Sequence, residues 1–260
     1  MLTKSHGLGN DYLVADPAEL PFAVSPERVK LLCHRHLGVG SDGLLLLAGD
    51  TGLRIVNPDG SEAEKSGNGI RIFARWLVSS GRAPGNDFVV HTRGGDVPVS
   101  VSGNEVTADM GKPRFGELTS LDGIGRVVSV DMGNPHCVVP VQELDITTLR
   151  RLGPRIEHDP LFPNRTNVQL ARAATRERIE LLIWERGAGE TQASGSSACA
   201  AFAALHRLGQ VDRAVTASMP GGALQLWLDE HDHIWMRGAV EEVAHITLSA
   251  DLIARLQALP

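Results

Sequence analysis

The stretch that decides the fold is residues 184–200, which read WERGAGETQASGSSACA. It is typical of the end of an apolar strand, followed by a glycine-rich turn and a helix that begins at Ser194. The helix continues through residues 200–205, which read AAFAAL. Small residues at the start of a buried helix are typical of an anion site, because a helix N-terminus presents backbone N–H groups. The stretch therefore predicts an anion site at Ser194.

A second copy of this pattern lies in the first half of the chain. A Glu-x-x-x-Ser-Gly element occurs at residues 62–67 and again at 190–195, so Ser66 and Ser194 are 128 positions apart. Other landmarks recur in the same order at nearly the same offset: Gly9-Asn10 with Gly133-Asn134, Gly81 with Gly209, Gly94-Gly95 with Gly221-Gly222, and Gly111 with Gly238. This order indicates a duplicated domain.

The two halves predict an α+β fold. Residues 66–81 indicate a helix that begins at Ser66, is apolar on most sides and ends at Gly81, so we expect it to be buried as the helix after Ser194 is. Strands outnumber helices, and no alternation of parallel strands and helices is sustained. We expect two pseudo-symmetric halves, residues 1–117 and 118–249, each a strongly curved, mostly antiparallel sheet wrapped around its central helix. Residues 250–260 are expected to pack back on the first half.

Composition narrows the classes of function. The net charge of −6 and the 4% aromatic content argue against nucleic acid as a partner. No window approaches the ~18 apolar residues of a membrane-spanning helix, and the N-terminus lacks the apolar core of a signal peptide. The three cysteines are odd in number and lack metal-like spacing. We therefore expect a cytoplasmic protein that binds neither membrane nor metal.

Two helices that each begin at a serine suggest a site for proton transfer next to a carboxylate. Each helix N-terminus carries a partial positive charge, and two of them are suited to grip one carboxylate from two sides. Ser66 and Ser194 would then flank the adjacent α-carbon, where a proton is removed on one face and returned on the other. The commoner role for a serine at a helix start is plain N-capping. The duplicated context favours a functional site.

Four motifs resemble those of the diaminopimelate epimerase family: HGLGND at 6–11, GNG at 67–69, MGNPHC at 132–137 and ERGAGET at 185–191. The resemblance extends over essentially the whole chain. It implies an amino-acid epimerase that needs no cofactor, forms a homodimer and interconverts LL- and meso-2,6-diaminopimelate in lysine and peptidoglycan biosynthesis. In that family two cysteines act as a thiolate/thiol pair. By motif they fall at Ser66 and Ser194, so this chain departs from the family at both.

The departure has a large chemical effect. A thiol has a pKa of about 8.5, and a serine hydroxyl is less acidic by roughly five units. Forming the ionised, basic oxygen of serine therefore costs ~7 kcal/mol more than forming a thiolate. The chain is therefore expected to be catalytically impaired. Three explanations remain open: an engineered Cys→Ser form, a natural relative that acts as a racemase or isomerase of another amino acid, and a non-catalytic amino-acid-binding protein. Ser197, where the family more often has glycine, and Lys65 are further departures.

The resemblance implies roles for the remaining site residues. Gly67, Asn68, Gly195 and Ser196 are expected to donate backbone N–H groups to the reacting carboxylate. Glu185 and Arg186 are expected to bind the distal amino-acid group, although a solvated ion pair is the commoner reading of such a pair. His136, with Glu185, is expected to tune the ionisation of the catalytic pair. The expected substrate-binding amides are Asn10, Asn57, Asn134 and Asn167, and for Asn57, before a proline, a simple turn role is the alternative.

Overall fold

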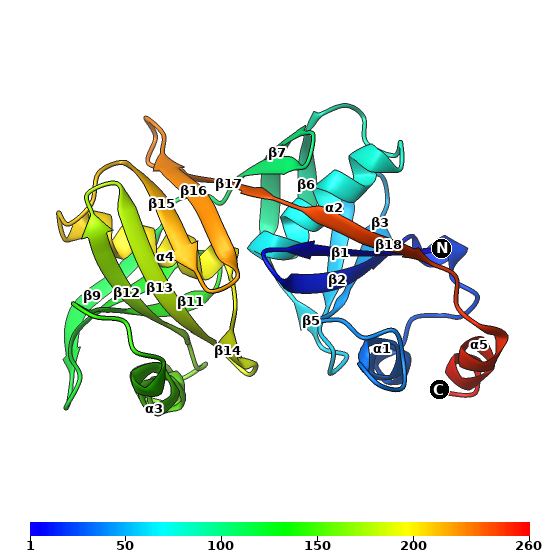
Figure 1. The fold of residues 1–260 in the computed structure, drawn as a ribbon, viewed down its shortest axis with the longest axis horizontal. Coiled ribbons are helices and arrows are strands. Elements are labelled where there is room, and N and C mark those ends of the chain that lie inside the picture. Colours follow the sequence, from blue (N-terminus) through cyan, green and yellow to red (C-terminus); the bar gives the residue numbers. More distant parts are fainter. The chain divides into compact units, whose positions relative to one another are not determined.

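The computed structural model describes residues 1–116 and 119–260 in full. The chain divides into two compact units: unit 1 consists of Met1–Ala108 with Ala239–Pro260, and unit 2 of Asp109–Gly238. Each unit consists of strands around one buried helix (Figure 1). The predicted α+β class, with its mostly antiparallel sheet and two similar halves, is confirmed.

Unit 1 surrounds helix α2 (Gly67–Ser79). Its strands are β1 (Leu2–Gly7), β2 (Asn10–Ala15), β3 (Leu44–Ala48), β4 (Gly52–Val56), β5 (Glu62–Ala63), β6 (Asp87–Thr92), β7 (Gly95–Ser102), β8 (Glu105–Asp109) and β18 (Glu241–Ile246). Its other helices are a 3-10 turn at Pro17–Glu19, α1 (Pro26–Cys33) and α5 (Ala250–Gln257). Most pairings are antiparallel, but β2 and β3 run parallel, with Leu13 opposite Leu44.

Helix α2 is buried because apolar side chains occupy most of its surface. Its first residues are as buried as its centre, and Phe73 is completely enclosed. Ser66 is the N-cap, as predicted, and Gly81 ends the helix with a positive φ of 70°. That left-handed conformation favours glycine.

Unit 2 repeats this plan around α4 (Gly195–Arg207), drawn in yellow in Figure 1. Its strands are β9 (Arg114–Leu121), β10 (Gly125–Asp131), β11 (Pro135–Pro140), β12 (Asn167–Thr175), β13 (Arg178–Glu185), β14 (Gly189–Thr191), β15 (Ala214–Met219), β16 (Gly222–Leu228) and β17 (Ile234–Ala239). Strands β11 and β12 are parallel, with Cys137 opposite Val168. Gly209, with a φ of 72°, ends α4 as Gly81 ends α2.

The sequence analysis did not anticipate helix α3 (Ile146–Glu157), which begins at its N-cap Asp145. Leu149 and Ile156 are fully buried and pack with Val168 and other residues of β10, β11 and β12 into one apolar cluster. The helix therefore covers part of the outer face of the unit 2 sheet.

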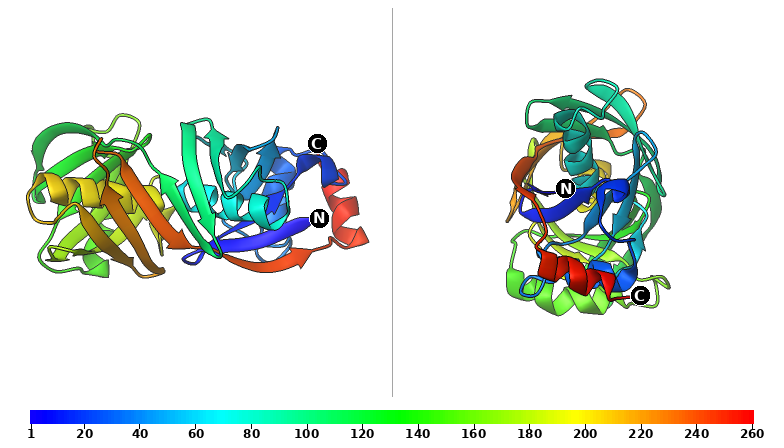
Figure 2. Two further views of the ribbon diagram at one scale, coloured as in Figure 1. Left: turned by 90° about the horizontal axis from the view of Figure 1, so that it is seen from above. Right: turned by 90° about the vertical axis from the view of Figure 1, so that its right-hand side faces the viewer.

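The C-terminal helix α5 packs on α1 within unit 1 (Figure 2). Leu256 is fully buried in the cluster that contains Val29 and Leu32. Arg28 fixes the contact, because its Nε donates to Leu256 O (2.8 Å) and its Nη2 to Leu259 O (2.6 Å). Throughout the described part of the chain, the helices are too short or too polar to cross a membrane.

Candidate active site

The start of α2 contains Ser66, whose backbone is extended with a φ of −141°. Its Oγ accepts the Gly69 N–H at 3.1 Å, so the serine caps its own helix. The hydroxyl of Tyr12, on β2, lies 3.4 Å from the same Oγ. Ser66 is half-buried, and Tyr12 is buried. The serine oxygen therefore contacts both a helix amide and a phenol.

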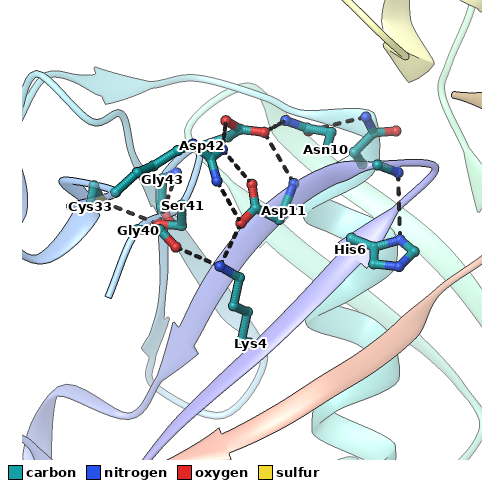
Figure 3. A network of polar contacts seen from close by, with 12 residues as sticks. Lys4, His6, Asn10, Asp11, Cys33, Gly40, Ser41, Asp42 and Gly43 are labelled. Atoms are coloured by element: carbon teal, nitrogen blue, oxygen red, sulfur yellow. Dashed lines mark hydrogen bonds and ion pairs between the residues drawn. The ribbon is translucent and has the colours of Figure 1, made fainter. Parts of the chain in front are cut away.

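A directed chain of hydrogen bonds fixes two predicted site residues of unit 1, Asn10 and Asn68. Arg71 Nη2 donates to Asn68 Oδ1 (3.0 Å), Asn68 Nδ2 donates to Asn10 Oδ1 (3.1 Å), and Asn10 Nδ2 donates to Asp42 Oδ2 (2.9 Å). Figure 3 shows the Asp42 end of this chain. Because a guanidinium lies at one end and a carboxylate at the other, both amides have only one favourable orientation. The structure thus brings Asn10 and Asn68 together beside Ser66.

Asp42 also belongs to a charged cluster, of which Figure 3 labels Asp11 and Lys4. Arg35 Nη2 bonds to Asp42 Oδ1 at 2.6 Å and to Asp11 Oδ1 at 2.8 Å, and Lys4 Nζ lies 3.0 Å from Asp11 Oδ2. Partial burial raises the pKa of the Asp11 carboxyl, but the hydrogen bonds from Arg35 and Lys4 outweigh burial, so its pKa lies below the usual value. The Asp11 carboxylate therefore remains ionised at neutral pH, and Arg35, which it shares with Asp42, holds Asp42 against Asn10.

Asn57 belongs to a turn. Its Nδ2 donates to Ser61 Oγ (3.0 Å), its backbone N–H donates to Ser61 O (2.8 Å), and its carbonyl accepts the Gly60 N–H (2.9 Å). These bonds close residues 57–61 into one loop. The local contacts of Asn57 are those of a turn residue, and its substrate role stays a prediction.

The start of α4 differs from that of α2. Ser194 has the same extended backbone, with a φ of −148°, but its side chain makes no capping hydrogen bond. Its exposed fraction is 5%, and Gly195 and Ser196 beside it are also buried. The first-turn amides of α4 are therefore not used by the N-cap side chain.

A buried polar network lies beside this helix start. Gln169 Nε2, on β12, donates to His136 Nδ1 (3.0 Å) and to Ser197 Oγ (3.0 Å). His136 Nε2 in turn donates to Asn134 Oδ1 (2.8 Å). Burial lowers the pKa of His136 to about 3, and the charge of Arg186 adds to this effect. The imidazole is therefore neutral, with its proton on Nε2.

The turn after β13 contains the predicted pair Glu185 and Arg186. Arg186 is exposed, and its backbone N–H donates to Asn167 Oδ1 at 3.0 Å. Asn167 Nδ2 donates to Pro135 O at 2.9 Å, so this predicted amide joins the turn to β11. Glu185 is half-buried. Asn167 and Asn134 therefore both lie at the start of the β11–β12 pair, in the same unit as the Glu-Arg turn.

Glu157, at the end of α3, supports this turn and was not predicted. It is only 4% exposed, its Oε1 accepts the Gly187 N–H (2.9 Å), and its Oε2 accepts the Trp184 indole N–H (2.8 Å). A Cβ at Gly153 would lie 2.6 Å from the Trp184 ring, so glycine there allows the ring to approach α3. The sequence contained no local signal for Glu157, because α3 itself was not anticipated.

The sequence analysis also missed Tyr12, Asp42 and Gln169. For Tyr12 a signal was present. Asn10 corresponds to Asn134 in the duplication, so Tyr12 corresponds to His136, and both side chains lie near a helix start. Asp42 and Gln169 reach their partners because strands distant in sequence pair in parallel. Local sequence motifs do not reveal such contacts.

The three cysteines do not replace the missing thiols. Cys33, Cys137 and Cys199 are all buried. Burial raises the pKa of Cys137 to about 12 and also raises that of Cys33. Among the described residues, no group of three or more His, Cys, Asp or Glu side chains is placed to hold a metal ion.

Solved structures share the fold of this chain. The chain aligns with a hydroxyproline epimerase from Agrobacterium vitis with bound trans-4-hydroxy-L-proline (TM-score 0.70, 17% identity, 94% of this chain and 90% of that one). It also aligns with a PhzF-family phenazine biosynthesis protein from Bacillus anthracis (TM-score 0.69, 16% identity, 94% and 97%). At these identities the likeness defines the fold alone.

Sequence similarity defines the family. The model of the diaminopimelate epimerase family matches residues 2–116 and 128–243. The chain is 43% identical to diaminopimelate epimerase 2 of Nostoc sp. (96% of both chains) and 41% identical to the diaminopimelate epimerase of Pelotomaculum thermopropionicum (93% of this chain, 96% of that one). The chain therefore belongs to the diaminopimelate epimerase family of amino-acid epimerases.

Proposed function

We propose that this chain binds diaminopimelate and exchanges the proton on its α-carbon, with Ser66 and Ser194 at the two positions where the family uses cysteine. The observation that supports this most strongly is that each serine is the N-cap of the one buried helix of its unit. A helix N-terminus favours the carboxylate next to the reacting carbon. Relatives that match over nearly their whole length are named for diaminopimelate.

The distal part of the substrate is assigned to the turn after β13. Arg186 is exposed, and Asn167 and Glu157 hold the backbone of this turn in place. Glu185 and Arg186 supply one carboxylate and one guanidinium from this turn, a combination that suits a group with both an ammonium and a carboxylate. On the family resemblance alone, we further propose that the chain is a cytoplasmic homodimer of lysine biosynthesis.

The two serines make the chain a weak catalyst in this proposal. Ionising a serine hydroxyl costs ~7 kcal/mol more than ionising a thiol. A helix N-terminus recovers only a small part of this difference. The arrangement is therefore one that binds substrate well and turns it over slowly.

The test is the double variant Ser66→Cys/Ser194→Cys. It is expected to gain LL-to-meso epimerase activity by at least about a thousandfold, measured by the appearance of the meso isomer. Either single variant should recover little, since a proton must be removed on one face and delivered on the other. A folded double variant that binds diaminopimelate in calorimetry without turnover contradicts an epimerase origin and favours a binding protein. Turnover of a different amino acid alone contradicts the substrate assignment.

A further inference from the structure

We propose that Tyr12 is a positioning residue for proton transfer, whose phenol oxygen accepts the hydroxyl proton of Ser66 while Ser66 takes the α-proton of the substrate. The inference rests on the proposed function, because it assigns how one of the two serines works there. It gives unit 1 a means of removing a proton without a cysteine.

The contacts of Ser66 leave its hydrogen for the phenol. Ser66 Oγ accepts the Gly69 N–H at 3.1 Å, and the Tyr12 hydroxyl lies 3.4 Å away. Either hydroxyl can be the donor of this contact while the phenol is neutral, and the serine hydrogen becomes the donor when the tyrosine oxygen is ionised. Hydrogen bonds used in catalysis are often long in unliganded enzymes and shorten when the substrate binds.

The position of the tyrosine ring depends on Gly43. A Cβ at residue 43 would lie 2.8 Å from Tyr12 Cε1 and 2.7 Å from Val56 O, and the φ of Gly43 is +155°. Ser41 Oγ donates to Gly43 O (2.9 Å), and that carbonyl also accepts the Leu13 N–H (3.1 Å). Glycine at this point of the β2–β3 pair therefore provides the space that the ring occupies.

The corresponding ring in unit 2 has a different partner. His136 follows Asn134 as Tyr12 follows Asn10, but His136 bonds to Gln169, which bonds to Ser197 and not to the N-cap Ser194. A titratable ring in direct contact with the N-cap serine is thus a feature of the α2 start. The inference therefore concerns one face of the substrate.

The step balances without a further reactant. Tyr12 first loses its proton to solvent. The α-C–H bond then breaks, its electron pair stays on the carbon and spreads into the carboxylate, the proton moves to Ser66 Oγ, and the original Ser66 proton moves to the phenolate. A phenol has an ordinary pKa of about 10, so its ionised form is far more readily available as the proton acceptor than that of serine. Once the hydrogen on Ser66 has exchanged with solvent, reversal returns a solvent-derived proton to the same face, so exchange with retention outpaces epimerisation.

The experiment measures deuterium entry at the α-carbon of LL- and meso-diaminopimelate in deuterated water, by mass spectrometry. Four chains are compared: the unchanged chain, Tyr12→Phe, Ser66→Cys, and Ser66→Cys with Tyr12→Phe. Phenylalanine keeps the ring against Gly43 and removes only the oxygen. Tyr12→Phe is expected to lower exchange about a hundredfold when residue 66 is serine, and less than tenfold when it is cysteine, because a thiol ionises by itself.

The outcomes separate the relay from the proposed function. An equal loss in both backgrounds overturns the relay, since it indicates a packing role for Tyr12. Exchange by the Ser66→Cys chain but none by the unchanged chain overturns the relay and the exchange activity proposed for the serine form, and leaves the assignment of diaminopimelate as the ligand intact. No exchange by any of the four chains or by Ser66→Cys/Ser194→Cys, all folded by near-UV circular dichroism, overturns both.

Discussion

The starts of α2 and α4 have the same backbone and different side-chain connections. Ser66 and Ser194 are both N-cap residues with extended backbones, yet only the side chain of Ser66 accepts a hydrogen bond from its own helix. At α2 a phenol contacts the N-cap serine, whereas at α4 the polar contacts pass to Ser197. The comparison shows that duplication fixed the position of the helix and left the polar contacts of each half free to diverge.

The divergence follows the strand register. Leu45 on β3 and Gln169 on β12 occupy corresponding positions, one residue beyond the Leu44 and Val168 partners of the parallel pairs. A Cβ at Gly69 would lie 3.1 Å from Leu45 Cδ2, while Ser197, the corresponding residue of α4, bonds to Gln169. Leu45 thus occupies the space beside a glycine in unit 1, where unit 2 has a hydrogen bond between two side chains. This difference makes the unit 2 start more sensitive to polar changes.

The largest expected effect is the acid sensitivity of unit 2. The pKa of His136 is about 3 in the folded chain, because of burial, and about 6.5 when unfolded. Between these values the unfolded state binds one more proton, so stability rises with pH and is lost as pH falls from about 6.5 toward 3. The free energy of unfolding should fall by about 3 kcal/mol from pH 7 to pH 4 through this residue. Urea unfolding across this range measures it, and His136→Gln should remove this dependence. An equal slope in the variant contradicts the assignment.

Replacing Gln169 by its unit 1 counterpart is the next largest change. Gln169→Leu leaves the buried Nδ1 of His136 and Oγ of Ser197 without their donor, which should cost about 2–3 kcal/mol. Adding Ser197→Ala should restore about 1 kcal/mol, because it removes one buried oxygen that has lost its hydrogen-bond donor. The exposed Gln142→Leu is the control and should stay within about 0.5 kcal/mol. Similar losses for Gln169→Leu and Gln142→Leu would show that the buried network contributes little.

Gly43→Ala tests the ring position in unit 1. The new Cβ meets Val56 O and the Tyr12 ring, so the variant should lose about 2 kcal/mol of stability and also lose α-proton exchange. Gly85, where a Cβ meets nothing within 4 Å, is the matched site, and Gly85→Ala should be neutral within about 0.5 kcal/mol. Full exchange activity in a folded Gly43→Ala chain argues that the ring position does not matter.

The smallest expected effect on stability is that of Asp42→Asn. Asp42 is partly exposed, so losing its ion pair with Arg35 should cost about 1 kcal/mol or less. The Asn10 amide then loses the carboxylate that fixes its orientation, and binding of diaminopimelate should weaken several-fold by calorimetry. Asp50→Asn, on an exposed turn, is the control. Unchanged affinity in Asp42→Asn would remove Asn10 from the proposed binding residues.

Local sequence patterns predicted the two buried helices and their ends. The apolar runs after Ser66 and Ser194 have to be enclosed, and Gly81 and Gly209 take the positive φ angles that end such helices. The pattern did not predict α3, whose polar outer face and internal Pro154 weaken the helical signal. The contacts of Asn57 with Ser61 also required the structure, because an asparagine before proline is compatible with either role.

The sequence by itself determined the duplication, the family and the presence of serine at both cysteine positions, because these depend on residue identity and spacing. Only the tertiary structure decided which polar groups lie at the two helix starts. Tyr12 is 54 positions from Ser66, and Gln169 is 28 positions from Ser197, so both contacts depend on how strands pair beneath a helix. Strand register and burial set these distances, and neither is written in the motifs that define the two helix starts.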